Sequence, residues 1–149
     1  MDYVSGIVTG MVFGTFDRLH EGHHFFLRNA RKQCDQLIAV VAQDVIVNAL
    51  KGHNPYQSIK DRIKAVQALT ICKMVVPGDT ILEQWRPIKR YKPGVIILGY
   101  DQESLGRAVR MFIRQNQKKG TNNYQSTILT ISLKAFQPHK YKSSYLNHH

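Results

Sequence analysis

The chain has 149 residues, a length that suits one compact domain, residues 1–149, and is short for two. Hydrophobic residues make up 43% and charged residues 21%, which excludes the low-hydrophobicity composition of a disordered chain. With 21 Lys and Arg residues against 10 Asp and Glu residues, the net charge of +11 favours nucleotides, nucleic acid or other acidic partners over carbohydrates or cations.

The positive charge is spread through most of the chain. Residues 1–50 contain four basic and five acidic residues, residues 51–100 contain nine and three, and residues 101–149 contain eight and two. The two cysteines, Cys34 and Cys72, lack a C-x-x-C motif and predict neither a disulfide framework nor a zinc site. No apolar run approaches the roughly 18 residues of a membrane-spanning helix, and the first residues lack a secretory pattern. We therefore expect a cytoplasmic protein without membrane contact.

Short runs rich in β-branched residues alternate with segments of helical periodicity. The predicted strands cover residues 7–13, 37–42, 73–76, 95–98 and 127–133. The predicted helices cover residues 22–33, a segment that begins at Ser58, a segment around residues 81–88, and residues 103–118. Ser58 and Asp61 form an S-x-x-D capping pattern. Pro87 shortens the third helix, which carries four apolar residues: Ile81, Leu82, Trp85 and Ile88.

This alternation predicts the fold class. Parallel strands need crossover connections, which return right-handed and place helices over both faces of the sheet. We expect an α/β, Rossmann-like, doubly wound domain with a five-stranded parallel sheet. Ligands of such sheets bind at the carboxyl ends of the strands. The segments to inspect are therefore residues 14–24, 43–58, 77–80, 99–103 and those after Leu133.

The segment that follows the first predicted strand contains the strongest local signal. Gly14 permits a tight turn close to a ligand, and the start of the next helix offers unpaired N–H groups to a phosphate. His20 and His23 can direct two imidazole N–H donors at one anion, and Gly22 between them leaves room for it. Two ordinary polar residues at a helix start would be the simpler interpretation of an isolated H-x-G-H motif. The strand, turn and helix context favours an anion site.

The complete string resembles the G-[TV]-F-D-x-x-H-x-G-H motif of the cytidylyltransferase-like nucleotidyltransferases, and it reads Gly14-Thr15-Phe16-Asp17-Arg18-Leu19-His20-Glu21-Gly22-His23. The resemblance extends over almost the whole chain. Lys51-Gly52-x-x-Pro55 and Arg62 are similar to the family's lysine loop and helix arginine. Residues 98–102 are similar to its nucleotide-base loop, in a G-x-D-Q form, and residues 138–144 replace its I-S-T-T element.

Three branches of this family remain open. The G-x-D-Q form and the Tyr-Lys-Ser-Ser segment at residues 141–144 are most similar to the archaeal-type FAD synthases, which adenylylate FMN. Glycerol-3-phosphate cytidylyltransferases and heptose phosphate nucleotidyltransferases share the first motif equally well. The implied partners are therefore ATP or CTP and a phosphorylated acceptor such as FMN or glycerol 3-phosphate, and relatives are often homodimers.

The resemblance also implies the reaction and the residues that perform it. A phosphate oxygen of the acceptor attacks the α-phosphorus of the nucleotide and expels pyrophosphate, so catalysis consists of positioning and charge neutralisation. His20 and His23 would stabilise the α-phosphoryl group, and Lys51 and Arg62 would bind the triphosphate. Mg²⁺ would be held mainly by substrate phosphates, with no protein metal site. The implied nucleotide-binding residues are Gly14, Thr15, Phe16, Gly22, Gly99, Tyr100, Asp101, Gln102, Lys142, Ser143 and Ser144, the two serines at the β/γ end.

Simpler roles exist for several of these residues. Lys51 and Arg62 are, taken alone, ordinary surface charges. Asp101 can cap the fourth helix without contacting a ligand. Ser143 and Ser144 can cap a terminal helical turn. Besides these, Asp17 is more typical of a turn-stabilising carboxylate than of a metal ligand, and Trp85 of a core residue than of a flavin-stacking one.

Two other classes of function are compatible with the charge. A nucleic-acid-binding module on the same fold would account for +11, but it predicts basic residues interleaved with exposed aromatic residues, and here the basic residues lie on helix faces opposite apolar stripes. A nucleotide-binding regulator without activity is disfavoured by the intact H-x-G-H motif. We therefore expect a nucleotidyltransferase.

Overall fold

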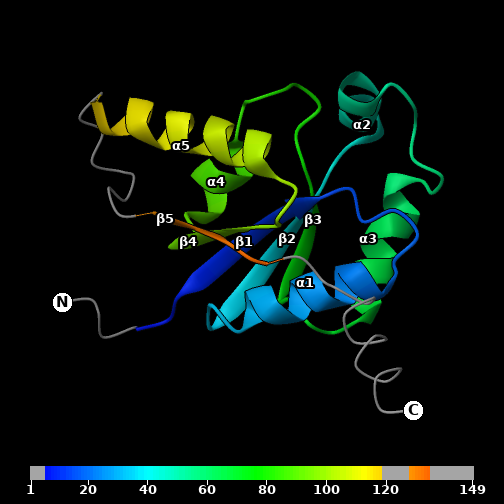
Figure 1. Ribbon diagram of the computed structural model, residues 1–149, viewed down its shortest axis with the longest axis horizontal. Helices are drawn as coiled ribbons and strands as arrows, with labels where there is room; N and C mark the ends of the chain where they lie inside the picture. Colours follow the sequence, from blue (N-terminus) through cyan, green and yellow to red (C-terminus); the bar gives the residue numbers. More distant parts are fainter. Residues whose placement is uncertain (1–5, 119–127, 135–149) are drawn as a thin grey trace, which may run out of the picture.

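The computed structural model describes residues 6–118 and 128–134 (Figure 1). The strands are β1 (Thr9–Gly14), β2 (Gln36–Val41), β3 (Met74–Pro77), β4 (Val95–Leu98) and β5 (Leu129–Ser132). The helices are α1 (Glu21–Arg31), α2 (Asp44–Lys51), α3 (Ile59–Ala68), α4 (Arg86–Tyr91) and α5 (Glu103–Lys118). Within the described ranges, no helix combines the length and the hydropathy needed to cross a bilayer.

The five strands form one parallel sheet in the order β3-β2-β1-β4-β5. β1 lies at its centre, so the chain builds outward through β2 and β3 and then crosses to β4 on the other side of β1. Gly14 pairs with Val41, which brings the carboxyl ends of β1 and β2 to the same edge. The reversal of strand order between β1 and β4 is the position where parallel sheets bind ligands.

The sheet separates two hydrophobic clusters. α1 and α3 cover one face and α4 and α5 cover the other, whereas α2 lies beyond the carboxyl end of β2 (Figure 1). Neighbouring strand residues point to opposite faces: Val12 belongs to the cluster that includes Leu27 of α1, and Met11 to the cluster that includes Ile88 of α4. Both faces are therefore dry, which explains why the inner strands are apolar throughout.

The doubly wound parallel fold predicted from the sequence is confirmed, and the observed bounds of α5 match the predicted helix 103–118. One predicted helix differs. Ile81 and Leu82 are 58% and 48% exposed and precede α4, which begins only at Arg86. The prediction that they belong to this helix is wrong, because Pro87 is in the first turn, where proline initiates a helix, and Asp79 accepts the Arg86 N–H at 3.1 Å.

The helix α2, within residues 43–58, was not predicted from the sequence. Its sequence, DVIVNALK, is rich in β-branched residues, which have a lower helix propensity. Only Val47 is buried, and at eight residues the run is too short for its apolar periodicity to separate a helix from a strand. Gly52, with φ of 80°, ends α2 in the left-handed conformation that favours glycine.

Candidate active site

The two histidines of the motif lie together at the start of α1. Nδ1 of His20 accepts the Gly22 N–H at 3.0 Å, and Nδ1 of His23 accepts the His20 N–H at 3.1 Å. The rings are tilted by 39° with their centroids 4.0 Å apart. Because each Nδ1 is an acceptor, the proton of each neutral ring is on Nε2. The helix start therefore presents two Nε2–H donors in addition to its own dipole.

Two glycines and Phe16 leave the space in which the His20 and His23 rings lie. A Cβ at Gly22 would lie 2.9 Å from Cε1 of His20, so a larger residue would displace the ring. A Cβ at Gly14 would lie 2.8 Å from the Phe16 ring. Phe16 is 3% exposed, and its ring centroid is 5.9 Å from that of His23. The Phe16 ring belongs to the core and supports His23, so a contact between Phe16 and a nucleotide would involve only its backbone.

The surroundings of His23 lower its pKa and favour the neutral ring. Burial, the largest cause, and the neighbouring His20, His24 and Lys51 lower the pKa of His23 to about 4 from an ordinary value of 6.5, and only Asp17 acts in the opposite direction. At neutral pH the ring is therefore uncharged. It can donate a hydrogen bond to an anion but adds no positive charge.

Lys51 reaches this site from the last residue of α2. Its Nζ donates to Oγ1 of Thr15 at 3.4 Å, and its charge is close enough to lower the pKa of His23. The helix fixes the point from which the long side chain extends, and the side chain itself is exposed. The structure therefore brings Lys51 and Thr15 together beside the histidine pair.

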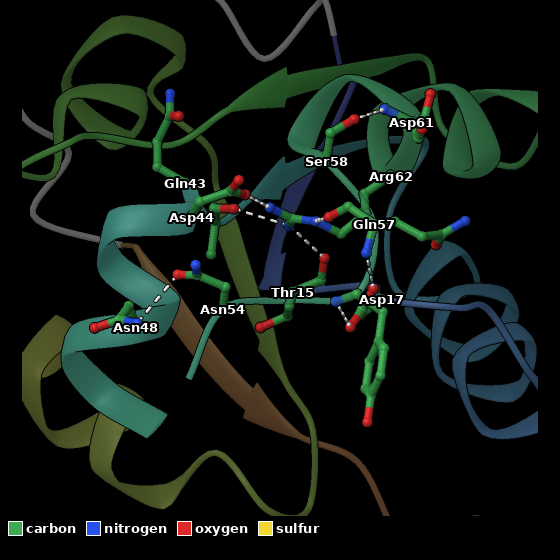
Figure 2. Close-up of polar contacts among 12 residues, drawn as sticks. Thr15, Asp17, Gln43, Asp44, Asn48, Asn54, Gln57, Ser58, Asp61 and Arg62 are labelled. Atoms are coloured by element: carbon green, nitrogen blue, oxygen red, sulfur yellow. Dashed lines mark hydrogen bonds and ion pairs between the residues drawn. The ribbon is translucent and has the colours of Figure 1, made fainter. Parts of the chain in front are cut away.

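Arg62 does not face the site. Its side chain is 0% exposed, and three backbone oxygens accept its hydrogen bonds: Gln57 O at 3.0 Å, Thr15 O at 2.8 Å and Ala42 O at 2.9 Å. The guanidinium also pairs with Asp44 at the start of α2 (Figure 2). This placement contradicts the expected contact with a triphosphate. Arg62 instead joins the loop after β1, the end of β2 and the start of α2.

Asp17 fastens the same loop. Its carboxylate accepts the N–H groups of Tyr56 at 2.8 Å and Gln57 at 3.0 Å. Figure 2 shows Asp17 beside Gln57. Burial alone would raise the pKa of Asp17, but these two N–H groups and the charges of Arg18 and Arg62 lower it below its ordinary value. The Arg18 N–H donates to Oε1 of Gln57 at 2.7 Å. These contacts support the interpretation of Asp17 as a turn-stabilising carboxylate.

The loop after β4 is closed by Gln102. Its Oε1 accepts the Gly99 N–H at 2.8 Å, and its Nε2 donates to Phe13 O at 2.7 Å, so the amide links the carboxyl ends of β4 and β1. The oxygen and the nitrogen of the Gln102 side-chain amide thus each form a hydrogen bond within the protein. Tyr100 is 67% exposed, and Asp101 is exposed with its Oδ1 only 3.3 Å from the position of a Cβ on Gly99. Tyr100 and Asp101 remain exposed, whereas the N–H and C=O of Gly99 both bond to Gln102.

Three predicted residues, Lys142, Ser143 and Ser144, lie outside the described residues. Two residues that organise the site were missed from the sequence: Asp44 and Gln57. Asp44 had a signal, an acidic residue shortly after the carboxyl end of a strand, whereas Gln57 had none beyond its place before the Ser58 cap. Within the described ranges, no group of three or more His, Cys, Asp or Glu residues could hold a metal ion.

Known proteins with similar sequences point to one family. The cytidylyltransferase-like family profile matches residues 11–146. The chain is 39% identical over 107 residues to the FAD synthase of Pyrococcus abyssi, covering 70% of each chain. It is 38% identical over 96 residues to that of Thermococcus sibiricus, covering 64% of this chain and 63% of the relative, which is less than two thirds of that protein.

A solved structure shares the fold. The lipopolysaccharide core biosynthesis protein of Thermoplasma volcanium is 25% identical and superposes with a TM-score of 0.73, over 89% of this chain and 100% of the other. The histidine pair at the helix start, the parallel sheet that positions it and the family profile together lead to one conclusion. The chain belongs to the cytidylyltransferase-like family.

Proposed function

We propose that the protein is an FMN adenylyltransferase: it transfers AMP from ATP to the phosphate of FMN and releases pyrophosphate. The observation that carries the proposal is the pair of Nε2–H donors of His20 and His23 at the start of α1, with Lys51 beside them. The identity to archaeal FAD synthases supports FMN as the acceptor and ATP as the donor.

The proposed mechanism needs no general base, because the acceptor phosphate is already an anion. One of its oxygens forms a bond to the α-phosphorus while the bond from that phosphorus to the bridging oxygen breaks, and the electron pair leaves with pyrophosphate. His20 and His23 donate to the α-phosphoryl oxygens, where negative charge is redistributed in the transition state. The neutral His23 loses little in this role, since a hydrogen bond in a half-buried site is strong without a formal charge.

The remaining residues position substrates. Lys51 would bind the triphosphate from the side of Thr15, and the exposed residues Tyr100 and Asp101 would bind the nucleotide base. Mg²⁺ would arrive with the phosphates, where it neutralises charge on the leaving group. Asp17 holds the loop through two backbone N–H groups, one on each carboxylate oxygen, and we assign it no role toward this ion. Arg62 would act only by holding the loop of Thr15 and the start of α2 in place.

The test is pyrophosphate release measured with ATP or CTP against FMN, glycerol 3-phosphate, a heptose 1-phosphate and 4′-phosphopantetheine. We expect release with ATP and FMN, and formation of FAD in equal amount. Release with CTP and glycerol 3-phosphate would instead assign the polyol branch, and no release with any pair would refute the nucleotidyltransferase activity. A His23→Gln variant serves as the control for pyrophosphate from contaminating enzymes.

A further inference from the structure

A groove continues from the histidine pair along the outer side of α1. It has a volume of about 500 Å³, and the described residues that line it are His20, Glu21, His24 and Arg28. His20, His24 and Arg28 follow one another at intervals of four residues, and this spacing places their side chains in one row along the helix. The His24 N–H donates to His20 O at 3.1 Å, so the row begins directly at the capping residue. The groove is thus an extension of the site.

The described residues that line the groove carry several hydrogen-bond donors, and the carbon atoms of their side chains form about half of its surface. The lining contains two imidazoles and one guanidinium against the single carboxylate of Glu21, and none of the four residues has an aliphatic or a Phe, Tyr or Trp side chain. Arg28 is exposed, and among the described residues no carboxylate forms an ion pair with it. These donors suit a small polyanion.

The length of the row also fits a chain of phosphates. Arg28 lies eight residues after His20, which corresponds to about 12 Å along the helix axis, and its long side chain can bend back toward the start of the helix. An anion bound at the Nε2–H of His20 therefore has two further hydrogen-bond donors nearby, the imidazole of His24 and the guanidinium of Arg28. During the proposed reaction, the charge that increases most is that of the leaving pyrophosphate, and it needs cationic partners.

We propose that this groove binds the pyrophosphate portion of the nucleotide, with His24 and Arg28 contacting the β- and γ-phosphates. This inference rests on the proposed function for the identity of the nucleotide. The sequence analysis assigned no role to either residue, because neither belongs to the H-x-G-H motif. His24 and Arg28 become binding residues for the leaving group, whereas His20 serves the α-phosphate at the end of the same groove.

The experiment measures binding of magnesium pyrophosphate and of AMP to the full chain by calorimetry, without any acceptor. Arg28→Ala is expected to weaken pyrophosphate binding about tenfold, and His24→Ala about threefold, while AMP, which lacks these phosphates, binds within about twofold of wild type. Arg28→Lys should retain most of the affinity. Lys64→Ala, which removes one exposed positive charge from α3, is the matched control and should change neither affinity.

The outcomes separate this inference from the proposed function. If Arg28→Ala binds pyrophosphate as tightly as Lys64→Ala does, or loses AMP and pyrophosphate affinity equally, the groove assignment is wrong. If wild type turns over FMN and ATP while the Arg28 variant keeps its pyrophosphate affinity, only the groove assignment fails. If wild type makes no product but the variant loses pyrophosphate affinity, the assignment of FMN fails and the groove stands.

Discussion

His20 uses its two ring nitrogens for different purposes. Nδ1 caps α1 through the Gly22 N–H, and Nε2–H is the donor proposed for catalysis. Asparagine is a good capping residue but has no donor at the Nε2 position. We therefore expect His20→Asn to lower kcat/KM by about 10²- to 10³-fold with a melting temperature within about 2 °C of wild type.

The comparison variant is His20→Ala, which removes the cap as well. It should lose as much activity as His20→Asn and, in addition, about 1 kcal/mol of unfolding free energy. Thermal unfolding and steady-state kinetics on the three proteins check both expectations. Near wild-type activity of His20→Asn, or an equal stability loss in the two variants, would show that the two nitrogens do not have separate roles.

His23 couples folding to pH. Its pKa in the folded protein, about 4, lies below the ordinary value of 6.5, so between these values the unfolded chain binds a proton that the folded protein does not. The contribution of His23 to stability is fully present above pH 6.5 and is lost as the pH falls toward 4. Urea unfolding across this range should show a steeper loss for wild type than for His23→Gln. Parallel curves would mean that the pKa of His23 is not lowered.

At the scale of elements, Arg62 holds together segments that are far apart in sequence. Replacing it with methionine leaves three buried carbonyl groups without their donor and removes the partner of Asp44. We expect Arg62→Met to reduce the unfolding free energy by about 3 kcal/mol or more. Activity should also decrease in the protein that remains folded, because Thr15 and the start of α2 lose their common anchor.

Arg107→Met is the matched control for this prediction. Arg107 forms an ion pair with Glu103 at 3.7 Å, but both side chains are largely exposed, so its loss should cost less than about 0.5 kcal/mol. Chemical denaturation of both variants measures the difference. If Arg62→Met were as stable as Arg107→Met, the buried hydrogen bonds of Arg62 would not organise the loops, and a direct role at the substrate would have to be reconsidered.

For the whole molecule, the net charge of +11 creates a field that attracts nucleotides. Part of it lies on the exposed side of α5 through Arg107, Arg110 and Arg114, opposite the core residue Val109. Since salt screens such a field over about 10 Å at moderate ionic strength, kcat/KM for ATP should fall at least about twofold between low and moderate KCl, with little change in kcat.

The same salt series distinguishes the nucleic-acid alternative. Binding to a single-stranded or duplex oligonucleotide in the nanomolar range, with a steep dependence on salt, would support that alternative. We expect only weak binding. A base could stack on an exposed aromatic side chain, but none lies between Arg107, Arg110 and Arg114 on the exposed side of α5. A kcat/KM for ATP that does not respond to KCl would show that the net charge has no part in nucleotide capture.

The sequence by itself determined the strands, most of the helices, the parallel sheet and the position of the histidine motif. These features depend on periodicity, caps and glycine at short range, as at Ser58, whose Oγ accepts the Asp61 N–H at 3.2 Å. The helix α2 was not predicted, because a run of eight residues rich in β-branched side chains is equally compatible with a strand.

Only the tertiary structure decided how the remaining site residues are used. Arg62 donates to Thr15, 47 residues earlier, and Gln102 to Phe13, 89 residues earlier, because the parallel sheet brings the carboxyl ends of its strands to one edge. Burial turned a predicted phosphate ligand into a structural anchor, and the fold left a groove open beside His24 and Arg28. Local patterns specify elements, whereas burial and long-range contacts exist only after the elements have packed.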